Sequence, residues 1–290
     1  MTLIREFAPA KINLYLHVTG RKDNGYHELD SLVAFASIGD EIALRPKKGF
    51  LFETTGRYAD ALSKDEQGNE NIAVKAARAL AASVGKDFAA HIVLVKNLPV
   101  ASGIGGGSSD AAATLRALAK HWGLFSEDPR LAAAAARHGQ DITVCLSTNP
   151  VYMIADGIEP APPLPKASIV LVNPGAPLST PDVFKAFRES GAPFSPPRKL
   201  EKAPQTLDEM IAALKERSND LYEPAKSVLP CVAEVMASLE ASPSCLLARM
   251  SGSGATCFGL YPDETAAKSV ASQIRAVRPH WWVETGTLNG

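Results

Sequence analysis

Alternating apolar and polar positions mark the strands of this chain. The alternation is clearest over residues 12–18, and Ile92 and Leu94 alternate in the same way ahead of a glycine-rich run. Two short segments, 41–45 and 50–54, are predicted to pair as a ribbon. Alternation sends successive side chains to opposite faces, which is typical of a half-buried strand. The first part of the chain is therefore predicted to be rich in strands.

Helical patterns separate these strands. Asn71 is expected to cap a helix that passes Leu80 and ends near Gly85. Further helices are predicted at residues 111–122, at residues 130–137, after Thr180-Pro181, at residues 225–239 and near the C-terminal end. Additional strands are expected at residues 168–172, around residues 251–261 and after the last helix. Prolines between Glu159 and Pro165 can sustain neither a helix nor a central strand, so we place a domain boundary between residues 164 and 165.

Composition argues against several classes of function. The 290 residues carry 30 basic and 31 acidic side chains, and no long basic run occurs, so no nucleic-acid partner is expected. The absence of a long apolar stretch and of a signal-peptide pattern predicts a cytoplasmic protein with no membrane partner. The four cysteines lack metal-ligand spacing and are expected to be reduced thiols.

A glycine-rich run, residues 98–110, lies between a predicted strand and a predicted helix. Glycine allows close approach of a ligand to the backbone, and a helix N-terminus attracts anions. A flexible linker is the alternative, but a linker is not normally confined between a strand and a capped helix. We therefore predict that this run binds phosphate through Pro99, Val100, Ala101, Ser102, Gly103, Ile104, Gly105, Gly106, Gly107, Ser108 and Ser109.

The spacing disfavours the two commonest phosphate loops. No Lys stands where a Walker loop requires it, and the last position of the dinucleotide pattern that starts at Gly103 is Ser108. The remaining pattern, Pro-x-x-x-Gly-x-Gly-Gly-Gly-Ser-Ser, resembles the second motif of the GHMP small-molecule kinases. Residues 8–16 and 250–256 are similar to the first and third motifs of that family, and they occur in the family's order.

The resemblance implies a fold, an activity and cofactors. The fold is a two-domain α+β GHMP-kinase-like fold, with a ribosomal-S5-like, nucleotide-binding domain at residues 1–164 and a ferredoxin-like domain at residues 165–290. The activity is phosphoryl transfer from ATP, with Mg²⁺, to an alcohol group of a small molecule.

A narrower resemblance points to one branch of this family. Gly25-Tyr26-His27 is similar to the branch that phosphorylates the 2-hydroxyl of methylerythritol in a cytidine-diphosphate-linked substrate, a step of non-mevalonate isoprenoid synthesis. Ala101-Ser102, Gln140 and Thr143 depart from the pattern of that branch. These departures leave the glycine core and Asp141 in place.

The resemblance assigns catalysis to Lys11 and Asp141. Asp141 is expected to act as the base for the acceptor hydroxyl, and Lys11 to pair with it and keep it ionised. Without the resemblance, Asp141 is as well explained as a helix cap, and Lys11 as a surface residue whose stem covers apolar neighbours. Ser108 and Ser109 are expected to contact phosphate or Mg²⁺, unless one of them only caps the helix. The metal ligands are not assigned.

The resemblance also places Asn13, Tyr26, His27 and Phe184 in the acceptor site. The ring of Tyr26 suits stacking on a pyrimidine, and the imidazole of His27 suits its polar edge. Phe184 matches the position of an opposing ring, and a core position on an amphipathic helix is the alternative.

Two other functions are kept open. One is a different GHMP kinase, such as a homoserine or mevalonate kinase, and Gly25-Tyr26-His27 argues against it. The other is a nucleotide-binding regulator that has lost catalysis, and the presence of both Lys11 and Asp141 argues against that.

Overall fold

The computed structural model describes residues 3–23, 25–155 and 157–289. Its internal contacts divide the chain into two compact units. The first unit consists of Met1–Ala10, Gly39–Val100 and Gly105–Thr148, and the second of Lys11–Ile38, Ala101–Ile104 and Asn149–Gly290. A boundary between residues 164 and 165 stays a prediction.

The sheet of the first unit joins strands that are not consecutive in the sequence. Strand β5 (Ala90–Val95) lies between residues 41–46 of β3 (His27–Pro46), to which it is antiparallel, and β4 (Leu51–Thr55), to which it is parallel. The ribbon expected between 41–45 and 50–54 is therefore wrong. Parallel neighbours need a crossover connection, and the segment between β4 and β5 supplies it with a helix.

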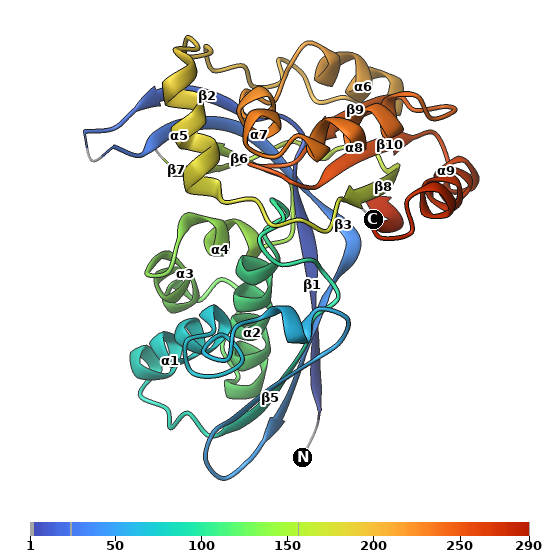
Figure 1. Cartoon of the computed structure of the whole chain (residues 1–290). Coiled ribbons are helices and arrows are strands. Elements are labelled where there is room, and N and C mark those ends of the chain that lie inside the picture. Colours follow the sequence, from blue (N-terminus) through green and yellow to red (C-terminus); the bar gives the residue numbers. More distant parts are fainter. Residues whose placement is uncertain (1–2, 24, 156, 290) are drawn as a thin grey trace. The chain divides into compact units, whose positions relative to one another are not determined.

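Four helices of the first unit pack on one another (Figure 1). They are α1 (Ile72–Val84), α2 (Gly106–Trp122), α3 (Pro129–Ala136) and α4 (Gln140–Cys145), and a short 3₁₀ helix, η1 (Ala59–Ala61), precedes them. The predicted cap of α1 is confirmed, because the Asn71 side chain accepts a hydrogen bond from the Ala73 N–H. Gly85 ends α1 in the left-handed conformation, as expected.

The second unit is built on an antiparallel sheet. Its strand order is β3–β11–β8–β10–β9, where β8 is Ala167–Asn173, β9 is Leu247–Met250, β10 is Cys257–Tyr261 and β11 is Trp282–Leu288. Strands β1 (Ile4–Asn13), β2 (His17–Arg21) and β6 (Val151–Ile154) also pair with β3, and β7 (Gly157–Pro160) pairs with β6. The strand expected at 12–18 is thus interrupted between β1 and β2. The strand at 168–172 is confirmed as β8.

The second unit also contains helices, most of which contribute side chains to its apolar core. They are α5 (Thr180–Ser190), α6 (Leu207–Lys215), α7 (Tyr222–Val228), α8 (Cys231–Glu240) and α9 (Glu264–Val277). The single helix expected at 225–239 is two helices, because Pro230 separates α7 from α8 and proline cannot continue a helix from within. In Figure 1, α5 and α7 run close together, and α9 lies beside β11. Val172, Val235 and Val283 lie in this core.

Two general expectations from the composition concern membranes and thiols. Within the described ranges, no helix combines the length and apolarity needed to span a bilayer. No disulfide joins the four cysteines, of which Cys145 and Cys257 are buried and Cys231 and Cys245 are partly exposed; that they are reduced thiols stays a prediction.

Candidate active site

The backbone of the glycine-rich run alternates in handedness. Ala101, Gly103 and Gly105 have positive φ angles of 50°, 77° and 63°, whereas the residues between them do not. Alternation of this kind turns successive N–H groups toward one side and forms a nest for an anion. At Gly103 a Cβ atom would lie 2.5 Å from the Ser251 carbonyl oxygen, so a side chain is excluded there for reasons of space as well.

In the first unit, helix α2 begins without a side-chain cap. Its N-cap residue is Gly105, which has no side chain to accept a hydrogen bond from the first turn. The proposal that Ser108 or Ser109 only caps the helix is therefore wrong. The hydroxyl of Ser109 is buried and has no hydrogen-bond partner among the described residues. An uncapped first turn leaves N–H groups and the positive end of the dipole available to an anion.

A buried cluster of three ionisable side chains lies under this helix start. Lys96 Nζ is 2.5 Å from Asp40 Oδ2 and 2.8 Å from Asp110 Oδ2, and all three side chains are nearly inaccessible to solvent. The other oxygen of Asp40 accepts hydrogen bonds from the backbone N–H groups of Asn97 and Leu98. The cluster therefore ties β3, the end of β5 and α2 together.

Sequence reasoning missed this cluster. Its only local signals were a Lys at the end of an apolar strand and an Asp inside an apolar helix. Burial raises the pKa of Asp110 to about 8, and the neighbouring Asp40 carboxylate adds to this rise while Lys96 opposes it. Burial acts to lower the pKa of Lys96, but the two carboxylates more than offset it and raise that pKa.

In the second unit, the segments of all three predicted motifs are hydrogen-bonded to one another. Ser251 Oγ accepts from the Asn13 N–H at 3.1 Å and donates to the Gly103 carbonyl at 3.1 Å. The Thr256 N–H donates to the Ser102 carbonyl. The Lys11 N–H donates to the Ile104 carbonyl at 2.9 Å. The turn that follows β9 and the end of β1 thus hold the first half of the glycine-rich run.

The two residues expected to perform catalysis lie in different units. Lys11 belongs to the second unit, is 5% exposed, and its Nζ lies 4.0 Å from Met153 Sδ, so it is not a surface residue. Asp141 belongs to the first unit and is half-buried in the first turn of α4, after the N-cap residue Gly139, so it is not the cap. The pairing of Lys11 with Asp141 stays a prediction.

The residues expected to bind the acceptor lie in the second unit. Asn13 Nδ2 donates to Ser31 Oγ at 2.8 Å, and Asn13 Oδ1 is buried with no partner among the described residues. The ring of His27 is stacked on Phe184, with centroids 4.8 Å apart and planes 17° apart. Tyr26 is 75% exposed. This part of the second unit therefore combines a buried amide oxygen that lacks a partner among the described residues with an exposed aromatic ring.

The pKa of His27 is lowered by burial first, and then by the positive charges of Arg188 and Arg21. Its Nε2 atom is buried and has no partner among the described residues. The imidazole is therefore held in its neutral form, with one nitrogen that can accept a hydrogen bond.

Comparisons with known proteins agree with this geometry. Two family models match the chain, GHMP kinases N terminal domain at residues 71–149 and GHMP kinases C terminal at residues 199–280. A relative from Paramagnetospirillum magneticum, named 4-diphosphocytidyl-2-C-methyl-D-erythritol kinase, is 47% identical over 290 residues, which cover 99% of each chain. A relative of the same name from Rhodospirillum rubrum is 46% identical and covers 98% of this chain and 92% of its own.

The chain belongs to the GHMP kinase family.

Solved structures confirm the fold of this GHMP kinase. A crystal structure of 4-(cytidine 5'-diphospho)-2C-methyl-D-erythritol kinase matches with a TM-score of 0.80 and 32% identity, and it covers 99% of this chain and 100% of that one. The expected two-domain α+β kinase fold is therefore confirmed. So is the enzyme class, an ATP-dependent kinase of small-molecule alcohols.

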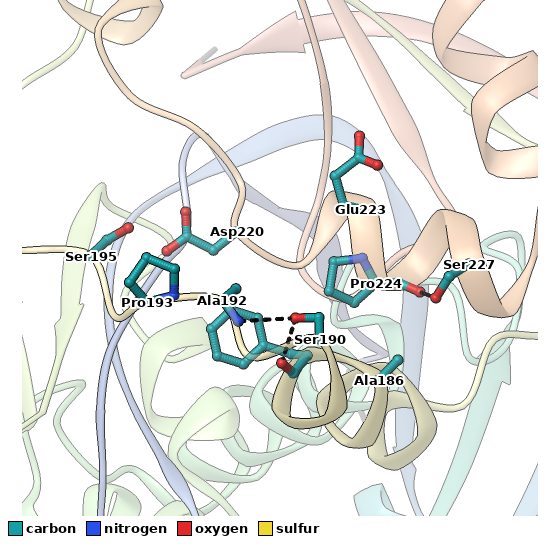
Figure 2. Close-up of a pocket in the computed structure, with 10 residues that line it drawn as sticks. Ala186, Ser190, Ala192, Pro193, Ser195, Asp220, Glu223, Pro224 and Ser227 are labelled. Carbon is teal, nitrogen blue, oxygen red and sulfur yellow. Dashed lines mark hydrogen bonds between the residues drawn. The ribbon is translucent and has the colours of Figure 1, made fainter.

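A pocket in the second unit of the kinase contains none of the predicted site residues. It has a volume of about 300 Å³ and lies between α5, α7 and the segment after α5 (Figure 2). Ser190 Oγ in its wall donates to the Phe187 carbonyl, and Ser227 Oγ donates to the Pro224 carbonyl. These two hydroxyls are therefore already satisfied within the chain, and Ser195, Asp220 and Glu223 are the other polar side chains that line the pocket.

Proposed function

We propose that this kinase transfers the γ-phosphoryl group of ATP to the 2-hydroxyl of 4-diphosphocytidyl-2-C-methyl-D-erythritol. The observation that carries the proposal is the pair of stacked rings, His27 on Phe184, next to the exposed ring of Tyr26. A pyrimidine needs flat apolar faces and a polar partner for its edge, and these three side chains provide both. The names of the full-length relatives support the same acceptor.

The triphosphate is proposed to lie on the glycine-rich run. The alternating φ angles from Ala101 to Gly105 and the uncapped start of α2 supply backbone N–H donors. Pro99 and Val100 lead the chain into this turn, and Gly107 and Ser108 continue it into α2. The residues of the run therefore act mainly through their backbone.

Magnesium is proposed to arrive with the nucleotide. The described residues hold no group of three or more His, Cys, Asp or Glu side chains that fits a metal. Mg²⁺ in kinases takes most of its oxygens from phosphates and water and only one or two from the protein. The unpartnered hydroxyl of Ser109 and the neighbouring Ser108 fit that demand. When bound, the ion neutralises charge on the transferred phosphoryl group.

Lys11 and Asp141 are proposed to act on the acceptor hydroxyl. The hydroxyl oxygen bonds to the γ-phosphorus, the bond from that phosphorus to the β–γ bridging oxygen breaks, and ADP leaves. Asp141 accepts the hydroxyl proton, and the Lys11 ammonium offsets the negative charge that accumulates. Asn13, whose amide oxygen is unpartnered, is proposed to orient the acceptor.

A turnover assay with several acceptors tests the proposal. The purified protein receives ATP, Mg²⁺ and, in separate reactions, 4-diphosphocytidyl-2-C-methyl-D-erythritol, its uridine analogue, homoserine and mevalonate, and ADP release is followed. We expect turnover with the cytidine compound and at least tenfold lower kcat/KM with the uridine analogue, because a site built on hydrogen bonds discriminates strongly (about 10⁴-fold in favourable cases). Preference for homoserine or mevalonate would contradict the assignment of the acceptor.

The reaction is proposed to take place in the cytoplasm. The four free cysteines support this, because thiols persist in reducing compartments.

A further inference from the structure

Three consecutive carbonyl groups of the glycine-rich run are anchored within the second unit. The Ser102 carbonyl accepts from the Thr256 N–H at 3.1 Å, the Gly103 carbonyl from Ser251 Oγ at 3.1 Å, and the Ile104 carbonyl from the Lys11 N–H at 2.9 Å. A peptide group is planar and trans, so its N–H points opposite to its C=O. Anchoring the carbonyls of Ser102 and Gly103 therefore turns the N–H groups of Gly103 and Ile104 away from these anchors.

The N–H groups of Gly103 and Ile104 remain available to bind an anion. In the part of the chain that the structure describes, no backbone hydrogen bond uses the N–H of Gly103 or Ile104. Two successive N–H groups that point the same way, flanked by alternating φ angles, form a cradle for an oxyanion. The direction in which these two N–H groups point therefore depends on the groups that hold the carbonyls of Ser102 and Gly103.

Only one of the three anchors is a side chain. Thr256 and Lys11 donate through their backbone N–H groups, which any residue other than proline supplies. Ser251 donates through its hydroxyl, which also accepts from the Asn13 N–H. Ser251 is fully buried, and its own N–H donates to the Thr256 carbonyl, so its position is fixed.

The turn that carries Ser251 is itself held rigidly. Asn219 Nδ2 donates to the carbonyls of Met250 and Gly252, each at 2.8 Å. A Cβ at Gly252 would lie 2.7 Å from the Gly103 carbonyl oxygen, so the two turns are in backbone contact. The backbone of Ser251 is thus held in place, and its one hydroxyl makes hydrogen bonds with both β1 and the glycine-rich run.

We propose that Ser251 is a positioning residue for the nucleotide: its hydroxyl orients the Gly103–Ile104 peptide group so that the N–H of Ile104 faces the triphosphate. This rests on the proposed function only in taking the glycine-rich run as the ATP site. It does not depend on the identity of the acceptor. Ser251 acts through Gly103 and Asn13 and needs no contact with the reacting atoms.

The test compares two serines of the same turn. Ser253 is also buried, but its hydroxyl lies 2.7 Å from Thr180 Oγ1 and not against the glycine-rich run. Ser251→Ala and Ser253→Ala each remove one buried hydroxyl, so both are expected to lower the melting temperature similarly. The Kd for ATP, measured by calorimetry without acceptor, is expected to rise about tenfold in Ser251→Ala and less than about twofold in Ser253→Ala.

A third variant covers the case in which Ser251→Ala folds poorly. Ser251→Cys fills nearly the same space with a weaker donor, and we expect an intermediate rise in Kd. Unchanged ATP affinity in both Ser251 variants, or an equal loss in Ser253→Ala, would overturn the proposal. If the wild-type protein binds ATP but does not phosphorylate the cytidine compound, only the proposed acceptor is contradicted. The comparison of ATP affinities among the variants then still tests the role of Ser251.

Discussion

At the scale of single residues, Asp141 is the base in the proposed mechanism. It is half-buried in the first turn of a short helix. Asp141→Asn keeps the shape of the side chain and removes the proton acceptor. We expect kcat to fall about 10²–10⁴-fold, with ATP affinity retained.

Asp128 offers a matched control for this change. It lies in the same unit and caps α3 by accepting from the Arg130 N–H, so its carboxylate has a structural task. Asp128→Asn is expected to leave kcat within about twofold, because asparagine is an equally good cap. Near-normal kcat in Asp141→Asn would remove Asp141 from the proposed mechanism.

Asp110 makes the stability of the protein depend on pH. The ordinary pKa of an aspartate side chain is 3.8, and burial is the main cause that raises the pKa of Asp110 to about 8 in the folded protein. Between these values the folded state binds one more proton than the unfolded state, so the free energy of unfolding falls as pH rises. Asp110→Asn cannot ionise and loses this dependence.

The measurement is urea unfolding of both proteins at several pH values. We expect the wild type to lose stability relative to Asp110→Asn from about pH 4 to about pH 8, and the difference to stay constant above that range. The asparagine can still accept from Lys96, so the variant is expected to fold. A difference that does not change with pH would show that Asp110 is ionised throughout.

At the scale of elements, the start of α2 shows why two adjacent glycines are not equivalent. A Cβ at Gly106 would lie 2.9 Å from Lys96 Nζ, which two carboxylates hold in place, whereas a Cβ at Gly107 would meet only Ile72 at an ordinary 3.5 Å. Gly106→Ala is therefore expected to lower the melting temperature. Gly107→Ala is expected to leave it unchanged or to raise it, since alanine favours a helix by about 1 kcal/mol over glycine.

Calorimetry of the two variants checks this prediction. If Gly106→Ala is as stable as Gly107→Ala, the buried cluster adapts and does not require glycine. A left-handed backbone is not the reason for glycine at position 106. Only Ala101, Gly103 and Gly105 in this run have positive φ.

Helices and strands that depend on neighbouring residues were predicted well, whereas contacts between residues far apart in the sequence were missed. The cap at Asn71, strand β5 and strand β8 follow from neighbouring residues, and all were found as expected. The pattern could not show that β5 separates β3 from β4, because alternation defines the faces of a strand and not its neighbours. It could not show the Lys96–Asp40–Asp110 cluster either, in which Lys96 lies 14 positions from one carboxylate and 56 from the other.

The same distinction applies to the candidate site. The glycine-rich run and Lys11, Asn13 and His27 could be proposed as site residues because short motifs carry them, and their roles stay predictions. The role of Ser251 depends on contacts 148 and 238 positions away along the chain, which only a fold brings together.

At the scale of the whole molecule, the connectivity of the chain predicts how it unfolds. The chain passes between the two units inside continuous strands, at residues 10–11 of β1 and 38–39 of β3. Loss of strand structure in one unit therefore frays the same strand where it enters the other. We expect one cooperative transition for residues 1–290.

Tryptophans in both units allow the test. Trp122 lies at the end of α2 in the first unit, and Trp281 and Trp282 lie in the second. Fluorescence of Trp122→Phe reports on the second unit, and that of the double variant Trp281→Phe/Trp282→Phe reports on the first. Coincident urea midpoints in the two variants, each checked against circular dichroism of the same protein, are the expected result. Two separate midpoints would mean that the shared strands do not couple the units, and that each unit unfolds independently.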